Sequence, residues 1–268
     1  MKKAIIALAM LAGIGAAQPC AAQKKVALKV STEMQGAENK AISLNKDKNG
    51  YITIFDGKTM NGWRGYGKNH VPARWTVEDG CLKFNKGEGE GGDIIFAHKF
   101  KNFIMEMEWK VTKGANSGIF YLAQEAKNAK GELLPIFFSA PECQVLDNEN
   151  HPDAKLGVDG NRKATSLYDM IPAKPQNAEP YDQWNKVCIV VNNGTVTHFM
   201  NGAKVLSYKL WTPEWTEMLQ KCKFSEQACP DAFHLLNNCG GDNHEGFIGL
   251  QDHGDTVYFR NIKVKELK

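Results

Sequence analysis

Two polar side chains follow an apolar, strand-like segment near the end of the chain. The segment reads GFIGL over residues 246–250, and Gln251 and His253 come directly after it with one residue between them. Successive side chains of a strand point to opposite faces, so these two share the face that the core does not use. An imidazole and an amide there contribute little packing but can bind a polar ligand. The spacing indicates a carbohydrate site.

A second pair of polar groups, Glu142 and Gln144, has the same spacing in the segment ECQVLD. A carboxylate and an amide on one sheet face can bind neighbouring hydroxyls of a sugar or act as acid or base. A solvated strand face explains the same spacing, and the sequence does not separate the two. Asp147 ends the segment, where a turn role competes with substrate binding.

Four further positions join the candidate set. His198 lies in the strand-like segment 195–200, and with His253 it offers two imidazoles that could share a ligand, a proton or a metal ion. Asn116 stands between glycines at a strand start, where local side-chain hydrogen bonds are the plainer explanation. Tyr168 could stack on a sugar ring, as could Trp63, Trp211 or Trp215, although core packing is the commoner role of an aromatic side chain. Trp184 opens the strand that pairs with the His198 strand and is a candidate for substrate binding.

The elements that must position these groups are short strands. Alternation is clearest over residues 103–111, where apolar side chains at every second position fall on one face. Asp79-Gly80, Asn193-Gly194 and Asn201-Gly202 predict tight turns. Many short strands, with one short helix around residues 213–221, predict an all-β sandwich or jelly roll. The loops 124–140, 148–183 and 210–245 are long and rich in Pro and aromatic residues, so we expect them to form walls around a site.

Composition excludes one large class of function. The chain has 33 basic and 30 acidic residues, well interspersed, and a net charge of +3. No basic run is long enough to follow a phosphate backbone, so no nucleic-acid partner is expected. We expect a single domain over residues 49–268, preceded by a polar tether at residues 23–48.

The first residues predict export. Two lysines, an apolar run from Ala4 to Ala17 and small residues up to Ala22 are typical of a signal peptide over residues 1–22, cleaved near Ala22. A lipid anchor at Cys20 is the less favoured alternative, because Pro19 is a poor residue before a lipidated cysteine. The run is short for a membrane span, and no other segment resembles one. We therefore expect a soluble periplasmic or extracellular protein.

An oxidising compartment permits disulfides among the six cysteines that remain. At least one bridge is expected in the loop-rich stretch that holds Cys222, Cys229 and Cys239. Cys143 and Cys188 lie in apolar runs and are expected to be buried free thiols. The spacings match no common zinc-ligand pattern.

These motifs occur together and in order in a known family. The chain resembles the 3-keto-disaccharide hydrolase domain family, common in exported proteins of gut Bacteroidetes, over about residues 50–266. The shared segments are FDGK at 55–58 with GW at 62–63, WTVEDG at 75–80, GANSGIF at 114–120, ECQVLD at 142–147, YD at 168–169, WN at 184–185, His198 with NG at 201–202, and IGLQDHG at 248–254.

The resemblance implies a concanavalin A-like jelly-roll β-sandwich with long loops around a concave sheet. It also implies cleavage of 3-keto-glycosides or 3-keto-disaccharides, which are oxidised at C3 of the sugar. Two departures stand out. Cys143 occupies a place where an apolar or aromatic residue is expected, and residues 220–245 form a cysteine-bearing insert that alters one wall of the substrate site.

A ketone at C3 makes the hydrogen on C2 acidic, so a base can remove it and expel the C1 substituent by β-elimination, leaving an enone that water can add to. Our hypothesis makes His253 or Glu142 the base and His198, Asn116 or Gln144 the donor to the enolate oxygen. A divalent cation held by histidines and a carboxylate could replace those donors, although no tight ligand motif is present.

Two alternatives stay open. The first is direct hydrolysis by two carboxylates, Glu142 with Asp147, Glu106 or Glu108. The second is a non-catalytic carbohydrate-binding module, because one fold serves both roles. All enzymatic interpretations require that the site residues, His198 and His253 included, converge in one hollow.

Overall fold

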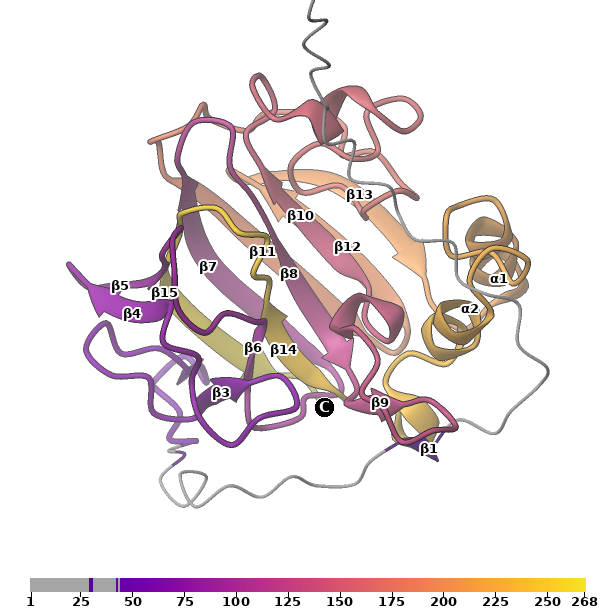
Figure 1. The fold of residues 1–268 in the computed structure, drawn as a ribbon, viewed down its shortest axis with the longest axis horizontal. Helices are drawn as coiled ribbons and strands as arrows, with labels where there is room; N and C mark the ends of the chain where they lie inside the picture. The colour runs from indigo at the N-terminus through magenta and orange to yellow at the C-terminus, as the bar shows by residue number, and fades with distance from the viewer. Residues whose placement is uncertain (1–28, 31–41, 43) are drawn as a thin grey trace, which may run out of the picture.

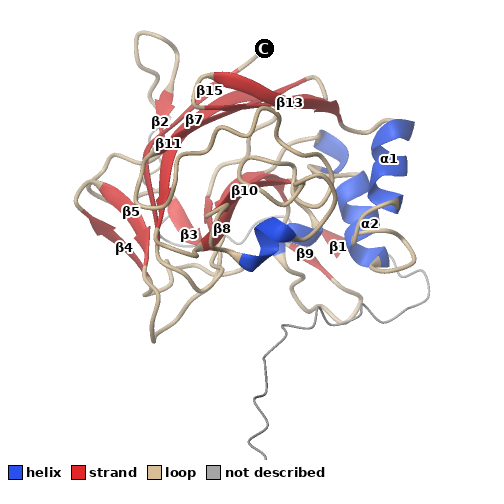
Figure 2. Ribbon diagram, turned by 90° about the horizontal axis from the view of Figure 1, so that it is seen from above, coloured by secondary structure: helices blue, strands red, loops and turns tan. Residues whose placement is uncertain are grey.

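Two antiparallel sheets form the body of the protein (Figure 1). The structure, a computed structural model, describes residues 29–30, 42 and 44–268, so the expected signal peptide and most of the expected tether lie outside the described residues. Figure 2 shows two layers, with one sheet arching over the other and the helices at one side. The fold is an all-β, jelly-roll sandwich, which confirms the predicted fold class.

The smaller sheet has five strands. In spatial order they are β10 (Glu142–Leu146), β8 (Asn116–Ala123), β14 (Phe247–Leu250), β6 (Ile94–Phe96) and β3 (Trp63–Gly65). The larger sheet runs β13 (Ala203–Lys209), β12 (Thr195–Met200), β11 (Asn185–Asn192), β7 (Phe103–Val111), β15 (Val257–Glu266), β5 (Cys81–Phe84) and β4 (Trp75–Glu78), with β2 (Ile52–Thr53) paired to β15. A separate pair joins β1 (Lys29–Val30) to β9 (Ala126–Lys127), so this part of the expected tether lies against the fold.

The core lies between the two sheets. Along β7, buried and half-buried side chains alternate without exception, as the sequence predicts for a strand with one face inward. The predicted turns also form, since Asp79, Asn193 and Asn201 and the glycines that follow them all have positive φ angles. Such angles match the twist of the flanking strands, which is why Asn-Gly and Asp-Gly favour tight hairpins.

Helices occupy one of the long loops. The predicted helix is α1 (Pro213–Gln220), with Thr212 as its N-cap, whereas α2 (Pro230–Asn237) was not predicted. Short 3-10 helices form at Ile136–Phe138, Pro152–Lys155 and Gly241–Asn243. No helix in the described part of the chain is long and apolar enough to cross a bilayer.

The expected disulfide near α2 is wrong. Cys222 and Cys239 are both free thiols, so no bridge joins the three cysteines of this stretch to one another. The Cys222 thiol instead donates to the Leu219 carbonyl within its own turn at 3.3 Å, and Cys239 is fully buried. Cys143 and Cys188 are free thiols as predicted, the first fully buried and the second half-buried.

Candidate functional site

Polar side chains from two adjacent strands meet on the outer face of the five-stranded sheet. Cys143 and Val145 of β10 point into the core, so Glu142 and Gln144 point outward, as the sequence predicts. Across the ladder Gln144 pairs with Gly118, and Asn116 stands two residues from Gly118 on the same face. All three polar side chains therefore share one surface.

Gly118 makes room for the carboxylate of Glu142. A methyl group on Gly118 would collide with Glu142 Oε1, so the carboxylate lies directly over this glycine. The adjoining part of the same face is filled by a small apolar cluster that includes Phe120, Ile95 and Ile136. The polar groups consequently occupy the part of the face that this cluster leaves uncovered.

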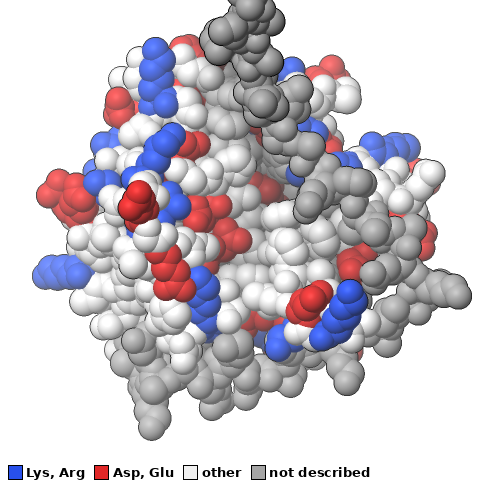
Figure 3. Space-filling model, in the orientation of Figure 1, with Lys and Arg blue, Asp and Glu red and all other residues white. Residues whose placement is uncertain are grey.

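The segment after β14 completes this surface. Gln251 donates its backbone N–H to the Gly118 carbonyl at 2.9 Å, which places it beside the Glu142 carboxylate. The next residue, Asp252, donates its backbone N–H to Asp93 Oδ1 at 2.9 Å. Its side-chain Oδ2 accepts a hydrogen bond from the Gly92 N–H at 2.7 Å. His253 follows and is exposed. Figure 3 shows acidic side chains near the middle of this face.

A loop adds a third wall. Residues 165–168 lie along β10, where Tyr168 donates its backbone N–H to the Glu142 carbonyl at 3.0 Å. The loop is held by Arg162, which bonds Asp153 at 2.8 Å and Asp169 at 2.6 Å. Tyr168 therefore stands next to Glu142, where an aromatic ring can border a sugar.

Glu142 is a buried acid with 7% of its surface exposed. Burial raises the pKa of Glu142 to about 8, with Lys223 opposing the shift and Asp93 and Asp153 adding to it. Burial also raises the pKa of Asp93 to about 7; the hydrogen bond from the Asp252 N–H opposes this shift, and the charge of the Asp252 carboxylate adds to it to a smaller extent. Raised carboxyl pKa values at one surface are typical of groups that transfer protons near neutral pH.

Two buried oxygens on this surface are left without a hydrogen bond. Asn116 Oδ1 and Gln251 Oε1 have no partner among the described residues. A buried acceptor without a donor is unfavourable by about 1–3 kcal/mol. Hydroxyl groups of a bound sugar can supply the missing donors, so these two atoms favour a polyhydroxylated ligand.

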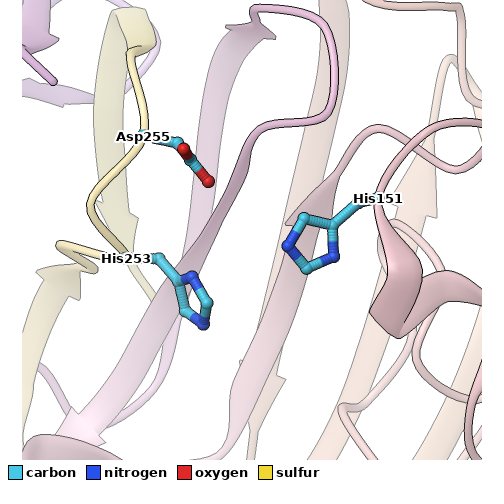
Figure 4. Close-up of side chains that lie close together, drawn as sticks. All are labelled: His151, His253 and Asp255. Carbon is cyan, nitrogen blue, oxygen red and sulfur yellow. The ribbon is translucent and has the colours of Figure 1, made fainter. Parts of the chain in front are cut away.

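A possible cation site lies at the edge of the same surface. One ligand atom from each of His151, His253 and Asp255 lies within 4.8 Å of the other two, and the three side chains point toward one another (Figure 4). Two imidazoles and a carboxylate are a known ligand set for divalent transition metals. However, His151 Nδ1 accepts the Asp153 N–H at 3.2 Å, so its Nε2 carries the proton and offers a donor rather than a lone pair. The tautomer of His151 thus does not fit a bound cation.

The expectation that His198 shares this surface is wrong. His198 lies on β12 of the other sheet and is fully buried between the layers. Its Nδ1–H donates to the Thr165 carbonyl at 2.9 Å, and its Nε2 accepts from the Tyr121 hydroxyl at 2.9 Å, which itself contacts the Tyr208 hydroxyl. Burial lowers the pKa of His198 to about 4, so the ring is neutral and satisfied within the core.

Two further candidates, Trp184 and Asp147, do not contribute to this surface, because the first lies on the other sheet and the second is engaged in hydrogen bonds to the backbone. Trp184 packs under the Arg260 guanidinium, 3.8 Å from its ring centre, on the outer face of the larger sheet. Asp147 caps its own turn by accepting from Gly114, Glu149 and Asn150, and these bonds lower its pKa although burial opposes them. Neither side chain is placed to bind a ligand at Glu142.

Sequence reasoning missed several residues that border this surface. They are Asp93, His151, Arg162 and Lys223, all from loops. Asp93 follows a glycine-rich loop and Lys223 lies in the insert after α1, but neither position carries a local pattern that marks it. Only the folded chain brings them beside Glu142.

Comparison with known proteins agrees with this architecture. Residues 50–265 match the family described as the 3-keto-alpha-glucoside-1,2-lyase-like domain. A Bacteroides thetaiotaomicron protein named 3-keto-disaccharide hydrolase is 58% identical, with each chain covered in full. A solved Parabacteroides distasonis protein, described as a candidate glycosyl hydrolase, is 30% identical with a TM-score of 0.68, over 82% of this chain and 95% of that one. A second from the same organism, 24% identical with a TM-score of 0.60 over 81% and 99%, shares the fold. The chain belongs to the 3-keto-alpha-glucoside-1,2-lyase-like domain family.

Proposed function

We propose that this protein cleaves glycosides whose sugar is oxidised at C3, by removing the C2 proton and eliminating the C1 substituent. The observation that carries the proposal is the buried carboxyl of Glu142 on a surface lined by unpaired acceptors. The family description and the name of the 58% identical relative support the substrate class.

In this proposal Glu142 is the base. In its ionised form it takes the C2 proton, and the electron pair of that bond moves toward the C3 carbonyl, which becomes an enolate. A carboxylate with a pKa near 8 is a stronger base than an ordinary glutamate, and about a tenth of it is ionised at pH 7. When the enolate reverts to the ketone, the C1–O bond breaks and a C1–C2 double bond forms.

In this proposal His253 is the general acid for the leaving group. It stands two residues after Gln251 on the same surface and is exposed, so it can donate a proton to the leaving oxygen and then assist water as it adds to C1. Water addition restores a 3-keto sugar and gives net hydrolysis.

Direct hydrolysis by two carboxylates has a weaker basis. Glu106 and Glu108 form ion pairs on the outer face of the other sheet, and Asp147 is held in its turn. Asp93 and Asp153 both raise the pKa of Glu142. Asp153 is paired with Arg162, so Asp93 is the better candidate to complete such a pair. A non-catalytic binding module would have no need of a buried acid with a raised pKa.

One assay separates these functions. The protein is incubated with a 3-keto-glucoside in heavy water, and the product and recovered substrate are followed by NMR. Elimination predicts deuterium at C2, whereas direct hydrolysis predicts cleavage without it. Tight binding of unmodified oligosaccharides without turnover of keto-sugars would favour the binding module.

Export is part of the proposal, on the basis of the basic start and the apolar run at residues 4–17. Amino-terminal sequencing of the protein from its native cells tests it. A mature chain that begins near residue 23 is expected, and a mature chain that begins at Met1 would contradict export by a cleaved signal.

A further inference from the structure

The insert after α1 places one cation over the candidate site. Lys223 is anchored by its backbone N–H, which donates to Asp169 Oδ2 at 3.1 Å, the residue next to Tyr168. The backbone of Lys223 is therefore fixed against the loop that borders Glu142. Its side chain retains contact with solvent and so can be reached by a ligand.

Aromatic rings orient the ammonium group of Lys223. Nζ lies 4.2 Å from the ring centre of Tyr168, 4.9 Å from that of Phe224 and 5.8 Å from that of Phe137. Cations are attracted to ring faces at such distances. Three rings together restrict the positions that the long side chain can adopt, so less conformational entropy is lost when the ammonium meets a ligand.

The charge of Lys223 is not neutralised by an ion pair. Arg162, which also borders this surface, bonds Asp153 and Asp169, whereas no described carboxylate forms an ion pair with Lys223. The Lys223 charge nevertheless acts on Glu142, where it opposes the rise in pKa. An oriented, accessible cation beside a buried acid is arranged to meet a negative charge that arises during the reaction.

We propose that Lys223 is a catalytic residue whose ammonium contacts the oxygen on C3 and stabilises the enolate formed when Glu142 removes the C2 proton. This inference rests on the proposed function. C2 bears the proton and is bonded to C3, so a base at C2 has the C3 oxygen close by. In this step the C2–H electron pair becomes the C2–C3 double bond and the carbonyl pair moves to oxygen. Glu142 gains the proton, and Lys223 keeps its own throughout.

The test compares Lys223→Met and Lys223→Arg with the wild type and with Lys221→Met, a matched loss of an exposed lysine two residues earlier. With a 3-keto-glucoside in heavy water, Lys223→Met is expected to lower both kcat and the rate of C2 deuterium exchange by about 100-fold or more. Lys223→Arg keeps the charge, so its kcat should remain within about tenfold of the wild-type value. The kcat of Lys221→Met should equal that of the wild type. Thermal melting verifies that each variant folds.

A pH profile supplies a readout that a merely structural role would not move. Because the Lys223 charge holds the Glu142 pKa down, the rising limb of kcat/KM should move to higher pH in Lys223→Met but not in Lys221→Met. If the wild type cleaves the 3-keto-glucoside and Lys223→Met is equally active, the role of Lys223 is overturned and the proposed function stands. A mass increment on Lys223 after cyanoborohydride treatment with substrate, together with an inactive Lys223→Arg, overturns it in favour of a covalent imine. A wild type that cleaves no 3-keto-glycoside overturns this inference and the proposed function together.

Discussion

Replacing Glu142 by Gln should make the protein more stable and nearly inactive at once. The folded carboxyl has a pKa of about 8, against an ordinary value of 4.5. Above pH 4.5 the unfolded chain releases this proton while the folded chain retains it, so stability falls as the pH rises from 4.5 to 8. Glutamine cannot ionise and is free of this loss.

The size of the effect follows from the pKa difference. At pH 7 the unfolded glutamate is about 2.5 pH units above its pKa, which corresponds to about 3 kcal/mol at 1.36 kcal/mol per unit. For a domain of this size, each kcal/mol raises the melting temperature by about 2–4 °C. Glu142→Gln should therefore melt about 6–12 °C above the wild type at pH 7 and at the same temperature near pH 4.

The activity of Glu142→Gln should fall, whereas its stability rises. Loss of a general base lowers kcat by about 10²–10⁴-fold, and the C2 deuterium exchange should fall with it. Wild-type kcat/KM should rise with pH toward about 8, because only ionised Glu142 accepts the proton. The control is Glu217→Gln, an exposed glutamate on α1 that should change neither property.

Two results would refute this reasoning. If Glu142→Gln and the wild type melt together from pH 5 to pH 9, the carboxyl is already ionised in the folded protein and its burial has no such consequence. If Glu142→Gln keeps full turnover, a group other than Glu142 accepts the C2 proton. If the wild-type kcat/KM falls with rising pH, Glu142 acts as a general acid and not as a base.

The remaining predictions concern groups outside the proton transfer. His198→Leu should destabilise the fold by about 1–3 kcal/mol, because buried partners lose their hydrogen bonds, yet leave kcat of the folded protein unchanged. The loss of stability caused by His198→Leu should shrink as the pH falls from 6.5 to about 4, since the unfolded His198 of the wild type takes up a proton before the folded one; calorimetry of both proteins measures the two effects. Asp147→Asn should lower the melting temperature without raising KM, and Trp184→Ala should not alter KM; a tenfold rise in either KM would place that residue at the substrate. Chelator treatment should leave kcat/KM unchanged, because His151 presents a proton toward the cation position; a loss restored by added metal would contradict this.

Local patterns predicted which way most strand residues point. The alternation in β10 was enough to place Glu142 and Gln144 on the face opposite Cys143 and Val145. The β11–β12 turn at Asn193 was predicted because its positive φ angle is a local requirement. These features depend on residues adjacent in sequence.

The same patterns did not predict which of the two sheets a given strand joins. The sequence predicts both His198 and His253 from strand periodicity, but His198 faces the core from the larger sheet, and His253 lies beyond the end of β14, the central strand of the smaller one. Alternation states which side chains share a face of one strand, and it does not state which sheet the strand joins or what covers that face.

The sequence by itself determined an all-β sandwich, the outward direction of Glu142 and Gln144, and the family, because these follow from period-two alternation, turn residues and ordered motifs. Tertiary structure alone decided the chemistry around Glu142. Burial raises its pKa, and the charges of Lys223 and Asp93 act on it from loops far away in sequence. Electrostatic interactions act through space and depend on the surrounding dielectric, so no spacing along the chain encodes them.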